Sequence, residues 1–267
     1  MSLRTVTCTR YVTPLREGGS LPAIIEADDD GMYVLKFRGA GQGPKALIAE
    51  LVAGEIGRSL GLAVPEIVFV ELDPELARTE PDPEIQSLIR ASGGLNLALD
   101  YLPGSVMFDP VAEKLDADLA SMVVWFDAFV TNVDRTPRNA NILMWHRRLW
   151  LIDHGAALYF HHTWTNYLER SRDSFRMIKD HVLLPFTSLH SLREIDPKMT
   201  ERITPDIIGD IVRLIPDVWL EAELQVSGSA FGGPADHRDA YIEYLLSRLE
   251  APHVFLEEAI RARSISV

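Results

Sequence analysis

Several features that assign a chain to a common protein class are scarce in this sequence. It contains a single cysteine, Cys8, which excludes an internal disulfide framework and fits a reducing compartment. Acidic residues outnumber basic residues by 39 to 26, and the resulting net charge of −13 argues against direct binding to nucleic acid or to anionic membranes. We therefore expect neither nucleic acid nor a membrane among its partners.

Long apolar runs are also absent. The best candidate, Met122 to Val130, is too short to span a bilayer and contains Asp127. The first residues form no apolar signal core, because Arg4 and Arg10 interrupt them, so we expect a cytoplasmic protein. With 267 residues, 47% of them hydrophobic, the chain can build one two-lobed domain or two small domains around a sizeable core.

Polar residues that could take part in catalysis or metal binding concentrate in one segment, from Thr131 to Ala156. Asp134 and Asn139 are five positions apart in a stretch that contains Pro137, which disfavours helix and strand. Two short apolar runs follow, joined by three polar residues, and this pattern predicts a β-hairpin that ends at Asp153. The loop and the hairpin would bring Asp134, Asn139 and Asp153 close together.

This grouping has the layout of a phosphotransfer site. Phosphoryl transfer needs an acidic residue that orients the attacking hydroxyl, and oxygen ligands that hold Mg²⁺ on the phosphates of ATP. Mg²⁺ binds carboxylate and amide oxygens and keeps part of its water. An Asp, an Asn five residues later and a hairpin ending in Asp-x-Gly have the spacing of the kinase motifs. The alternative is a surface hairpin with acidic turns, since Asp and Asn are common in turns.

The N-terminal region has the pattern of a small sheet. Alternating residues predict strands at 5–12, 21–27 and 32–37, with a turn-rich loop between the first two. In a kinase this loop covers the nucleotide phosphates, and Gly18 and Gly19 would let backbone N–H groups approach them. It is not a Walker loop, because no Gly-Lys-Ser/Thr follows. A plain flexible hairpin is the alternative.

A lysine and a glutamate follow at kinase-like positions. Lys36 lies on the third strand, where kinases carry the lysine that contacts the α- and β-phosphates; the alternative is an edge residue facing solvent. Apolar residues at three- and four-residue spacing predict a helix that starts near Pro44 and ends before Gly61. Because a helix glutamate pairs with the kinase lysine, Glu50 is the favoured partner and Glu55 its rival.

The segment that would join two lobes follows an insert. Strands are predicted at 66–72 and 95–101, and the acidic insert 73–92 between them includes a short helix near 83–91, for which we have no function. The second strand leads into Asp100, Tyr101 and Leu102. In a kinase the backbone of these residues would bind the adenine edge, whereas an ordinary strand and turn is the alternative.

The remainder of the chain is mainly helical in pattern. Helices are predicted at 111–130 and near 174–184, 205–214, 216–226 and 235–262. The fold class is therefore α+β. The expected architecture is that of a two-lobed protein kinase, with a small antiparallel β N-lobe at residues 1–102 and a larger, mainly helical C-lobe at residues 103–267.

The ordered motifs, spread over roughly residues 10–160, resemble those of the HipA-like kinases. The pair Asp134-Arg135 resembles their catalytic loop, and in the segment Glu50 to Pro65 a glutamate precedes Gly-Leu by eleven residues, as in that family. The resemblance implies a serine/threonine protein kinase that uses Mg²⁺ and ATP. Asp134 would be the catalytic base, with Asn139 and Asp153 as Mg²⁺ ligands. Asn141 precedes Ile-Leu, as the metal-binding Asn does in phosphoinositide kinases, so it is the alternative to Asn139.

The resemblance also implies partners and shows departures. Several family members are toxins with a DNA-binding antitoxin, so an antitoxin-like partner is implied beside an unknown protein or small hydroxyl substrate. Asp153-His154-Gly155 replaces Asp-Phe-Gly, and we expect no N-terminal HipA subdomain, because the chain starts directly at the first predicted strand. The alternative functions are an ATP-binding pseudokinase or partner-binding module, and a nucleotidyl transferase that would leave AMP on its target.

Overall fold

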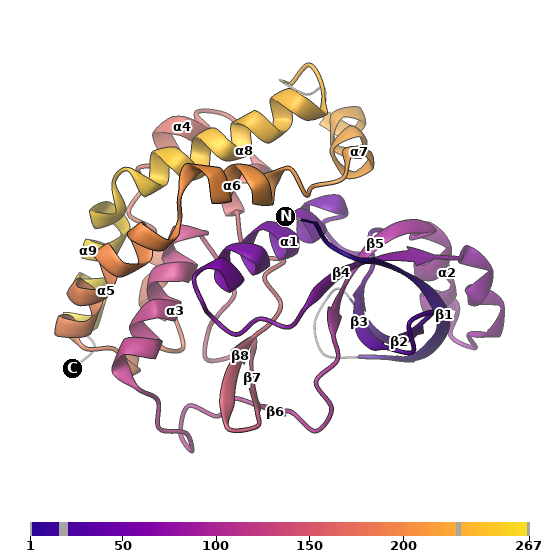
Figure 1. Ribbon diagram of the computed structural model, residues 1–267, viewed down its shortest axis with the longest axis horizontal. Coiled ribbons are helices and arrows are strands. Elements are labelled where there is room, and N and C mark those ends of the chain that lie inside the picture. Colours follow the sequence, from indigo (N-terminus) through magenta and orange to yellow (C-terminus); the bar gives the residue numbers. More distant parts are fainter. Residues whose placement is uncertain (1, 16–20, 228–230, 266–267) are drawn as a thin grey trace.

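The computed structural model describes residues 2–15, 21–227 and 231–265. Strands near the N-terminus form a closed barrel in the order β1-β2-β3-β5-β4 (Figure 1). Their bounds are β1 Thr5–Pro14, β2 Ala23–Ala27, β3 Met32–Lys36, β4 Ile67–Leu72 and β5 Gly94–Asp100.

The barrel is not antiparallel throughout, which corrects the prediction at one pairing. Strands β1–β2, β2–β3, β3–β5 and β4–β5 pair antiparallel, but β1 pairs with β4 in parallel, with Thr5 opposite Phe69. The helix α1, Pro44–Ser59, causes this difference. A helical crossover returns the chain to the end where the preceding strand began, so β4 runs in the same direction as β3 and β1.

Alternate residues of β4 and β5 belong to two different hydrophobic cores. Val68, Val70 and Ala98 pack inside the barrel, whereas Ile67 and Leu97 face the opposite side and join the larger core. Side chains alternate across a strand with a period of two, so these strands are apolar on both faces. The barrel wall therefore also serves as one wall of the helical region.

The acidic insert covers the barrel. A 3₁₀ helix η1, Pro74–Thr79, and helix α2, Pro83–Ala91, place Ala77, Ile85 and Ile89 in the barrel core. Asp73 and Asp82 are the N-caps of these two helices, and each side chain accepts a hydrogen bond from the backbone N–H two residues later. The insert therefore has a structural role in sealing the barrel.

Helix α1 is buried along most of its length. It packs against β4 and β5 and against α6 and α7. Gly54 allows the close approach to β4, since a Cβ there would lie 2.5 Å from the Ile67 Cδ1 atom. Trp219 of α7 adds a second link to the barrel, because its Nε1–H donates to the carbonyl of Leu95 in β5 at 3.1 Å. The barrel and the helices are thus joined through α1 and α7.

The rest of the chain consists of a small sheet and helices (Figure 1). The sheet has the order β6-β7-β8, with β6 Val106–Met107, β7 Ile142–Trp145 and β8 Arg148–Leu151. The other elements are α3 Ala117–Phe129, η2 Tyr159–His162, α4 Tyr167–Arg170, η3 Arg176–Asp180, η4 Leu184–Phe186, α5 Leu189–Arg202, α6 Pro205–Val212, α7 Asp217–Ser227, α8 Pro234–Leu249 and α9 Pro252–Ile265.

Two sequence predictions in the helical region were wrong, and one helix was not predicted. The segment 174–184 forms short 3₁₀ turns rather than a helix, and the predicted helix 235–262 is divided into α8 and α9 at Pro252. Helix α5 was not predicted, and Pro197 lies in its interior, where a proline disfavours a helix. Its packing against α3 and α9 outweighs the intrahelical hydrogen bond that the proline removes.

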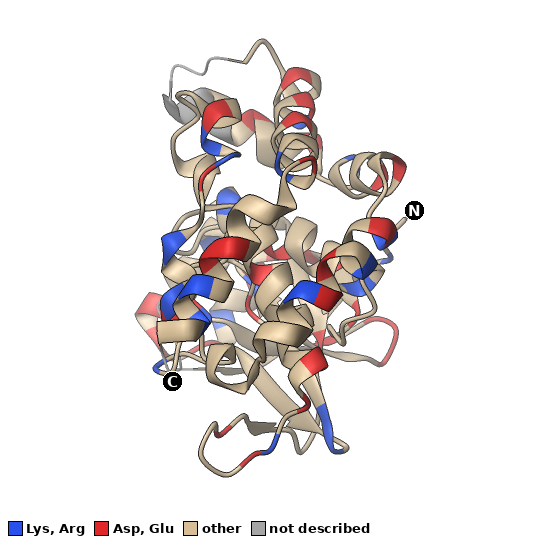
Figure 2. Cartoon of the chain, turned by 90° about the vertical axis from the view of Figure 1, so that its left-hand side faces the viewer, with Lys and Arg blue, Asp and Glu red and all other residues tan. Residues whose placement is uncertain are grey.

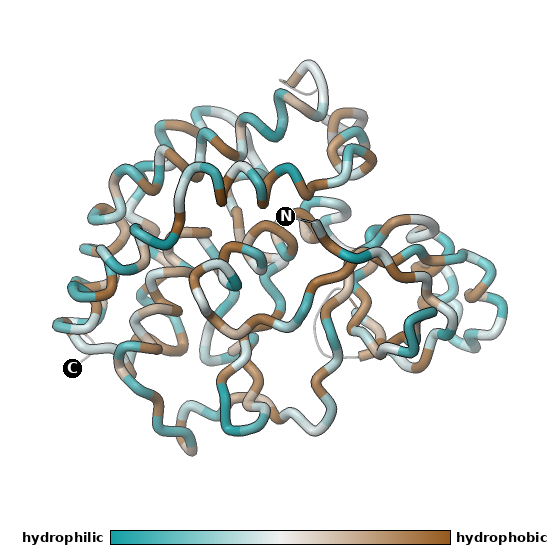
Figure 3. Tube along the Cα trace, in the orientation of Figure 1, coloured by the Kyte–Doolittle hydropathy of each residue, from teal (hydrophilic) through white to brown (hydrophobic). Residues whose placement is uncertain are grey.

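Charge and hydropathy follow this architecture. Figure 2 shows acidic and basic residues interspersed over the side of the molecule that carries the C-terminus. Figure 3 shows apolar segments in the barrel strands and in α1, and a hydrophilic tip on the β7–β8 hairpin. In the described part of the chain, no helix combines the length and hydropathy needed to cross a bilayer.

Candidate active site

The predicted lysine and glutamate lie together, at the junction of the barrel and α1. The Lys36 Nζ atom is 2.7 Å from Asp153 Oδ1 and 3.5 Å from Glu50 Oε2. Both Lys36 and Glu50 are largely shielded from solvent, with side chains 12% and 1% exposed. The rival Glu55 instead lies 3.3 Å from Arg58 on the same helix. The structure therefore brings Glu50, and not Glu55, to the lysine.

The charges in this group stabilise one another. Burial alone would lower the pKa of the Lys36 ammonium, but the carboxylates of Glu50 and Asp153 raise it above its usual value. Burial would likewise raise the pKa of Glu50, yet Lys36 and the hydrogen bonds from His154 hold it below its usual range. Lys36 therefore remains cationic and Glu50 anionic at neutral pH.

His154 replaces the phenylalanine of the common kinase triplet and has a different contact. Its side chain is fully buried, its backbone N–H donates to both oxygens of Glu50, and its Nδ1 lies 3.0 Å from Glu50 Oε1. Because a carboxylate only accepts, Nδ1 carries the proton. His154 thus fixes the glutamate that faces Lys36, and no signal in the sequence indicated this contact.

The loop after α3 brings the predicted aspartate and both asparagines together. Asn139 Nδ2 donates to Asp134 Oδ2 at 2.7 Å, and Asn141 Nδ2 lies 3.4 Å from the same oxygen. A tight turn between Thr136 and Asn139, closed by two backbone hydrogen bonds, sets this spacing. With both amide nitrogens turned toward Asp134, the amide oxygens are left for other ligands.

A buried ionic group lies beneath this loop. Asp127 of α3 accepts from Arg135 Nε at 2.5 Å, from His181 Nε2 at 2.9 Å and from Asn132 Nδ2 at 2.9 Å. Arg135 also donates to the carbonyl of Asn141, so one side chain joins both ends of the loop. In the sequence, the available signal for this group is an acidic residue, Asp127, within an apolar run.

The protonation of this buried group follows from its contacts. The backbone N–H of Leu183 donates to His181 Nδ1, so Nε2 carries the proton and donates to Asp127. Burial lowers the pKa of His181, which keeps the ring neutral. Burial would raise the pKa of Asp127, but Arg135 and His181 lower it well below its usual range. Asp127 is therefore a permanent anion paired with Arg135.

Two adjoining cavities meet at Lys36, Asn139 and Asp153. The larger, of about 560 Å³, is lined by apolar side chains such as Val34 and Leu143 and by all three predicted inter-lobe residues, Asp100, Tyr101 and Leu102. Asn141 also lines it. The smaller, of about 370 Å³, contains Glu50 and Asp134 in its wall. A ligand that fills the first cavity would extend polar groups toward the second.

The backbone at the inter-lobe segment is partly engaged. The N–H groups of Asp100 and Tyr101 donate to the carbonyls of Glu66 and Met32. Among the described residues, no acceptor is found for the N–H of Leu102. Of these three amides, that of Leu102 is therefore the one left for a ligand by the described part of the chain. The predicted phosphate-covering glycines, Gly18 and Gly19, lie outside the described residues.

Comparisons with known proteins found one matching family and several similar solved structures. A family model described as HipA-like kinase matches residues 9–255. No curated protein sequence matches the chain. The crystal structure of the Helicobacter pylori proinflammatory kinase CtkA is similar over 97% of this chain and 99% of that one, with a TM-score of 0.54 and 14% identity. A Golgi casein kinase structure aligns with 96% of this chain and 72% of its own, with a TM-score of 0.46 and 12% identity.

Proposed function

Because this chain belongs to the HipA-like kinase family, we propose that it transfers the γ-phosphoryl group of Mg-ATP to a serine or threonine of a protein. The observation that carries the proposal is the meeting of Lys36, Asp153 and Asn139 at the junction of two cavities, one of which also contains Asp134. Kinase chemistry requires a cation for the phosphates, oxygen ligands for the metal and a base for the hydroxyl. Lys36, the pair Asp153 and Asn139, and Asp134 would supply them.

The larger cavity suits a nucleoside. Its volume lies in the range of small-molecule sites, and its apolar walls, which include Val34 and Leu143, can enclose a flat base. The free N–H of Leu102 would donate to the adenine edge, whereas the amides of Asp100 and Tyr101 already have acceptors. Lys36 lines both this cavity and the smaller one, and its ammonium would contact the α- and β-phosphates.

The oxygen donors beside Lys36 fit Mg²⁺. Within the described residues no three His, Cys, Asp or Glu side chains form a metal-binding cluster, so a cation would be held by the Asp153 carboxylate with amide oxygens. Mg²⁺ accepts such a sparse donor set because phosphates and water complete its coordination. Asn139 lines both cavities and Asn141 only the larger, so we favour Asn139 and keep Asn141 as the alternative. Bound Mg²⁺ would neutralise charge on the phosphates.

Asp134 would act on the acceptor. Its carboxylate orients the hydroxyl and takes its proton while the acceptor oxygen forms a bond to the γ-phosphorus. The bond from that phosphorus to the bridging oxygen breaks, and ADP leaves with the electron pair. Asn139 holds Asp134 Oδ2 by its 2.7 Å hydrogen bond, which fixes the base beside the smaller cavity. Glu50 keeps Lys36 in place throughout.

We extend the proposal to the organisation of the chain. Residues 1–102 would form the N-lobe and residues 103–267 the C-lobe, with the nucleotide between them. A cytoplasmic location, an antitoxin-like partner and a small hydroxyl substrate stay predictions from the sequence.

Two substitutions test the proposed function. Asp134→Ala should reduce phosphate transfer about a hundredfold or more, since general-base catalysis contributes that much, while ATP affinity changes little. Asp153→Ala should weaken ATP binding measured by calorimetry only when Mg²⁺ is present. Asp239→Ala, an exposed aspartate on α8, is the control and should match the wild type.

Either of two outcomes would contradict the proposal. One is the absence of ATP binding with or without Mg²⁺. The other is the appearance of AMP, rather than phosphate, on the modified target in mass spectrometry, which would indicate nucleotidyl transfer.

A further inference from the structure

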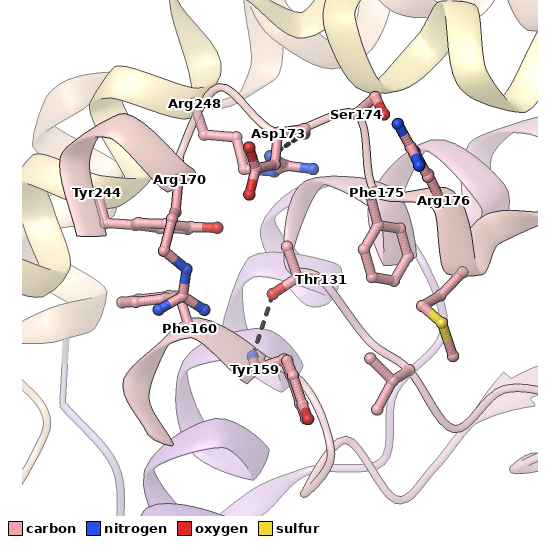
Figure 4. A pocket seen from close by; sticks show the side chains of 12 residues that line it. Thr131, Tyr159, Phe160, Arg170, Asp173, Ser174, Phe175, Arg176, Tyr244 and Arg248 are labelled. Carbon is pink, nitrogen blue, oxygen red and sulfur yellow. Dashed lines mark hydrogen bonds between the residues drawn. The ribbon is translucent and has the colours of Figure 1, made fainter. Parts of the chain in front are cut away.

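A third large cavity, of about 580 Å³, lies beside the start of the loop that carries Asp134 (Figure 4). We name it the acceptor cavity. Thr131 and Val133 of that loop, residues between 170 and 177, and Arg248 of α8 contribute to its wall. Val133 and Tyr159 also line the smaller cavity that contains Asp134. A molecule with its hydroxyl at Asp134 could therefore continue into the acceptor cavity.

The acceptor cavity is rich in positive charge, although the chain has a net charge of −13. Arg170, Arg176 and Arg248 line it, against a single carboxylate, Asp173. Figure 4 places Arg170 and Arg176 on opposite sides of the space. The cavity is thus a local cationic site in an acidic protein.

The three arginines differ in how far they are engaged. Arg248 is buried and donates to backbone carbonyls, including those of Ala128 and Ser171, without an ion pair to any described carboxylate. Arg170 donates from Nη1 to the Thr163 carbonyl at 2.6 Å. Arg176 is exposed, and within the described part of the chain its guanidinium has neither a hydrogen bond nor an ion pair. Arg176 is therefore the guanidinium most available to a bound anion.

Apolar side chains surround these charges. Phe160 stacks on Tyr244 with a centroid separation of 3.4 Å, which makes a rigid wall. At the edge, Tyr159 and Met177 are 55% and 50% exposed. Large exposed apolar and aromatic side chains beside a pocket are typical of surfaces that bind another protein. A small hydroxyl compound seated at Asp134 would leave this surface unused, whereas a polypeptide would cover it.

We propose that the acceptor cavity binds the stretch of a protein substrate next to the phosphorylated hydroxyl and selects an acidic side chain there. The inference rests on the proposed function for the position of the hydroxyl, but its charge selectivity can be measured without phosphate transfer. Arg176 is the main specificity residue, because carboxylates form strong, charge-assisted hydrogen bonds with a free guanidinium. Arg170 adds to the positive electrostatic potential of the cavity. The aromatic wall formed by Phe160 and Tyr244 contacts the peptide chain.

The test uses short labelled peptides with a central serine and one glutamate at each flanking position in turn, beside glutamine and lysine counterparts. Their binding to the wild type, Arg176→Glu and Arg90→Glu is followed by fluorescence anisotropy without ATP. Arg90 is exposed on α2 and gives a matched change in charge away from the cavity. At the preferred position the wild type should bind the glutamate peptide about tenfold more tightly than the glutamine peptide.

The variants should separate a local effect from a general one. Arg176→Glu should lose this preference and favour the lysine peptide, while Arg90→Glu should keep the wild-type preference. Added salt should reduce the preference, because the cavity is partly open to solvent. Equal binding of glutamate and glutamine peptides at every position, or an unchanged preference in Arg176→Glu, would overturn the inference.

A second measurement distinguishes this inference from the proposed function. The same peptides are incubated with Mg-ATP, and phosphate incorporation is measured. Selective binding that depends on Arg176, but without incorporation into any peptide, would leave the cavity assignment standing and refute the protein kinase proposal. Phosphate incorporation without a preference for acidic peptides would support the protein kinase proposal and refute the assignment of the acceptor cavity.

Discussion

Arg135 follows Asp134 directly in the chain, yet its guanidinium is buried beneath the loop rather than exposed in the cavity. It pairs with Asp127, and it donates to the Asn141 carbonyl. A buried pair of this kind adds little net stability compared with apolar packing, but removing one partner leaves an uncompensated charge. The pair therefore sets the loop geometry and makes the protein sensitive to its loss.

Asp127→Ala should lower the free energy of unfolding by about 3 to 5 kcal/mol, because Arg135 would stay buried without a counter-ion. Asp210→Ala removes an exposed ion pair with Arg213 and should cost less than about 1 kcal/mol. Urea denaturation followed by fluorescence measures both. Similar losses in the two variants would show that the Asp127 pair is not a determinant of the fold.

Individual site residues can be predicted from their spacing in the sequence. Lys36, Glu50, Asp134, Asn139 and Asp153 were selected from their order and separation, and the structure brings all of them to the same pair of cavities. Their supporting residues were not selected. The reason is that Asp127, His154 and His181 act through buried contacts, and a partner distant in sequence cannot be identified from local pattern.

At the scale of elements, the β7–β8 hairpin has a two-residue turn, His146-Arg147, between Trp145 and Arg148. Both turn residues have positive φ, 49° and 61°, which defines a type I′ turn. Such turns favour Asn-Gly, because other side chains are strained in the left-handed region. The hairpin that precedes Asp153 in the chain therefore carries local backbone strain at its turn.

The double substitution His146→Asn with Arg147→Gly should raise the free energy of unfolding by about 1 kcal/mol. The turn lies at the hydrophilic tip, away from the cavities, so ATP affinity should not change. Thermal denaturation and calorimetry test the two expectations. The contrasting control is Arg148→Gly, at the first residue of β8, which should destabilise the hairpin.

Elements with strong periodicity were predictable, and elements with conflicting signals were not. Helix α1 and strands β3 to β5 were expected close to their observed bounds because pattern, caps and turns agree there. The 3₁₀ turns η3 and η4 are too short to show an apolar period, so local pattern does not predict them. Pro197 gave a breaker signal within α5, and packing on two neighbouring helices overrides it.

At the scale of the whole molecule, burial of histidines links stability to pH. Burial lowers the pKa of His161 and His181, and it lowers that of His237 to about 4. Neither ring nitrogen of His237 has a hydrogen-bond partner among the described residues, whereas Phe231 stacks on its ring at 4.4 Å. In the unfolded chain all three histidines titrate near their ordinary pKa of about 6.5.

Stability should therefore fall as the pH decreases from about 6.5 toward 4, since the unfolded chain then binds more protons than the folded one. His237→Phe keeps the aromatic stack and should reduce the loss between pH 7 and pH 4 by about 3 kcal/mol. His190→Gln, at an exposed site, is the control for replacing a histidine. Urea denaturation across this pH range is the measurement, and an identical slope in His237→Phe would contradict the assignment.

The parallel pairing of β1 with β4 has a consequence for synthesis on the ribosome. The β2–β3 hairpin is local and can pair as soon as it emerges, but β1 lacks β4 until the chain has passed α1. Because β5 lies between β3 and β4, closure waits until Asp100 has left the exit tunnel. Cys8 is buried inside the closed barrel, where burial raises the pKa of its thiol to about 11. In shorter nascent chains this thiol would be open to alkylation, so its protection from alkylation reports when the barrel closes.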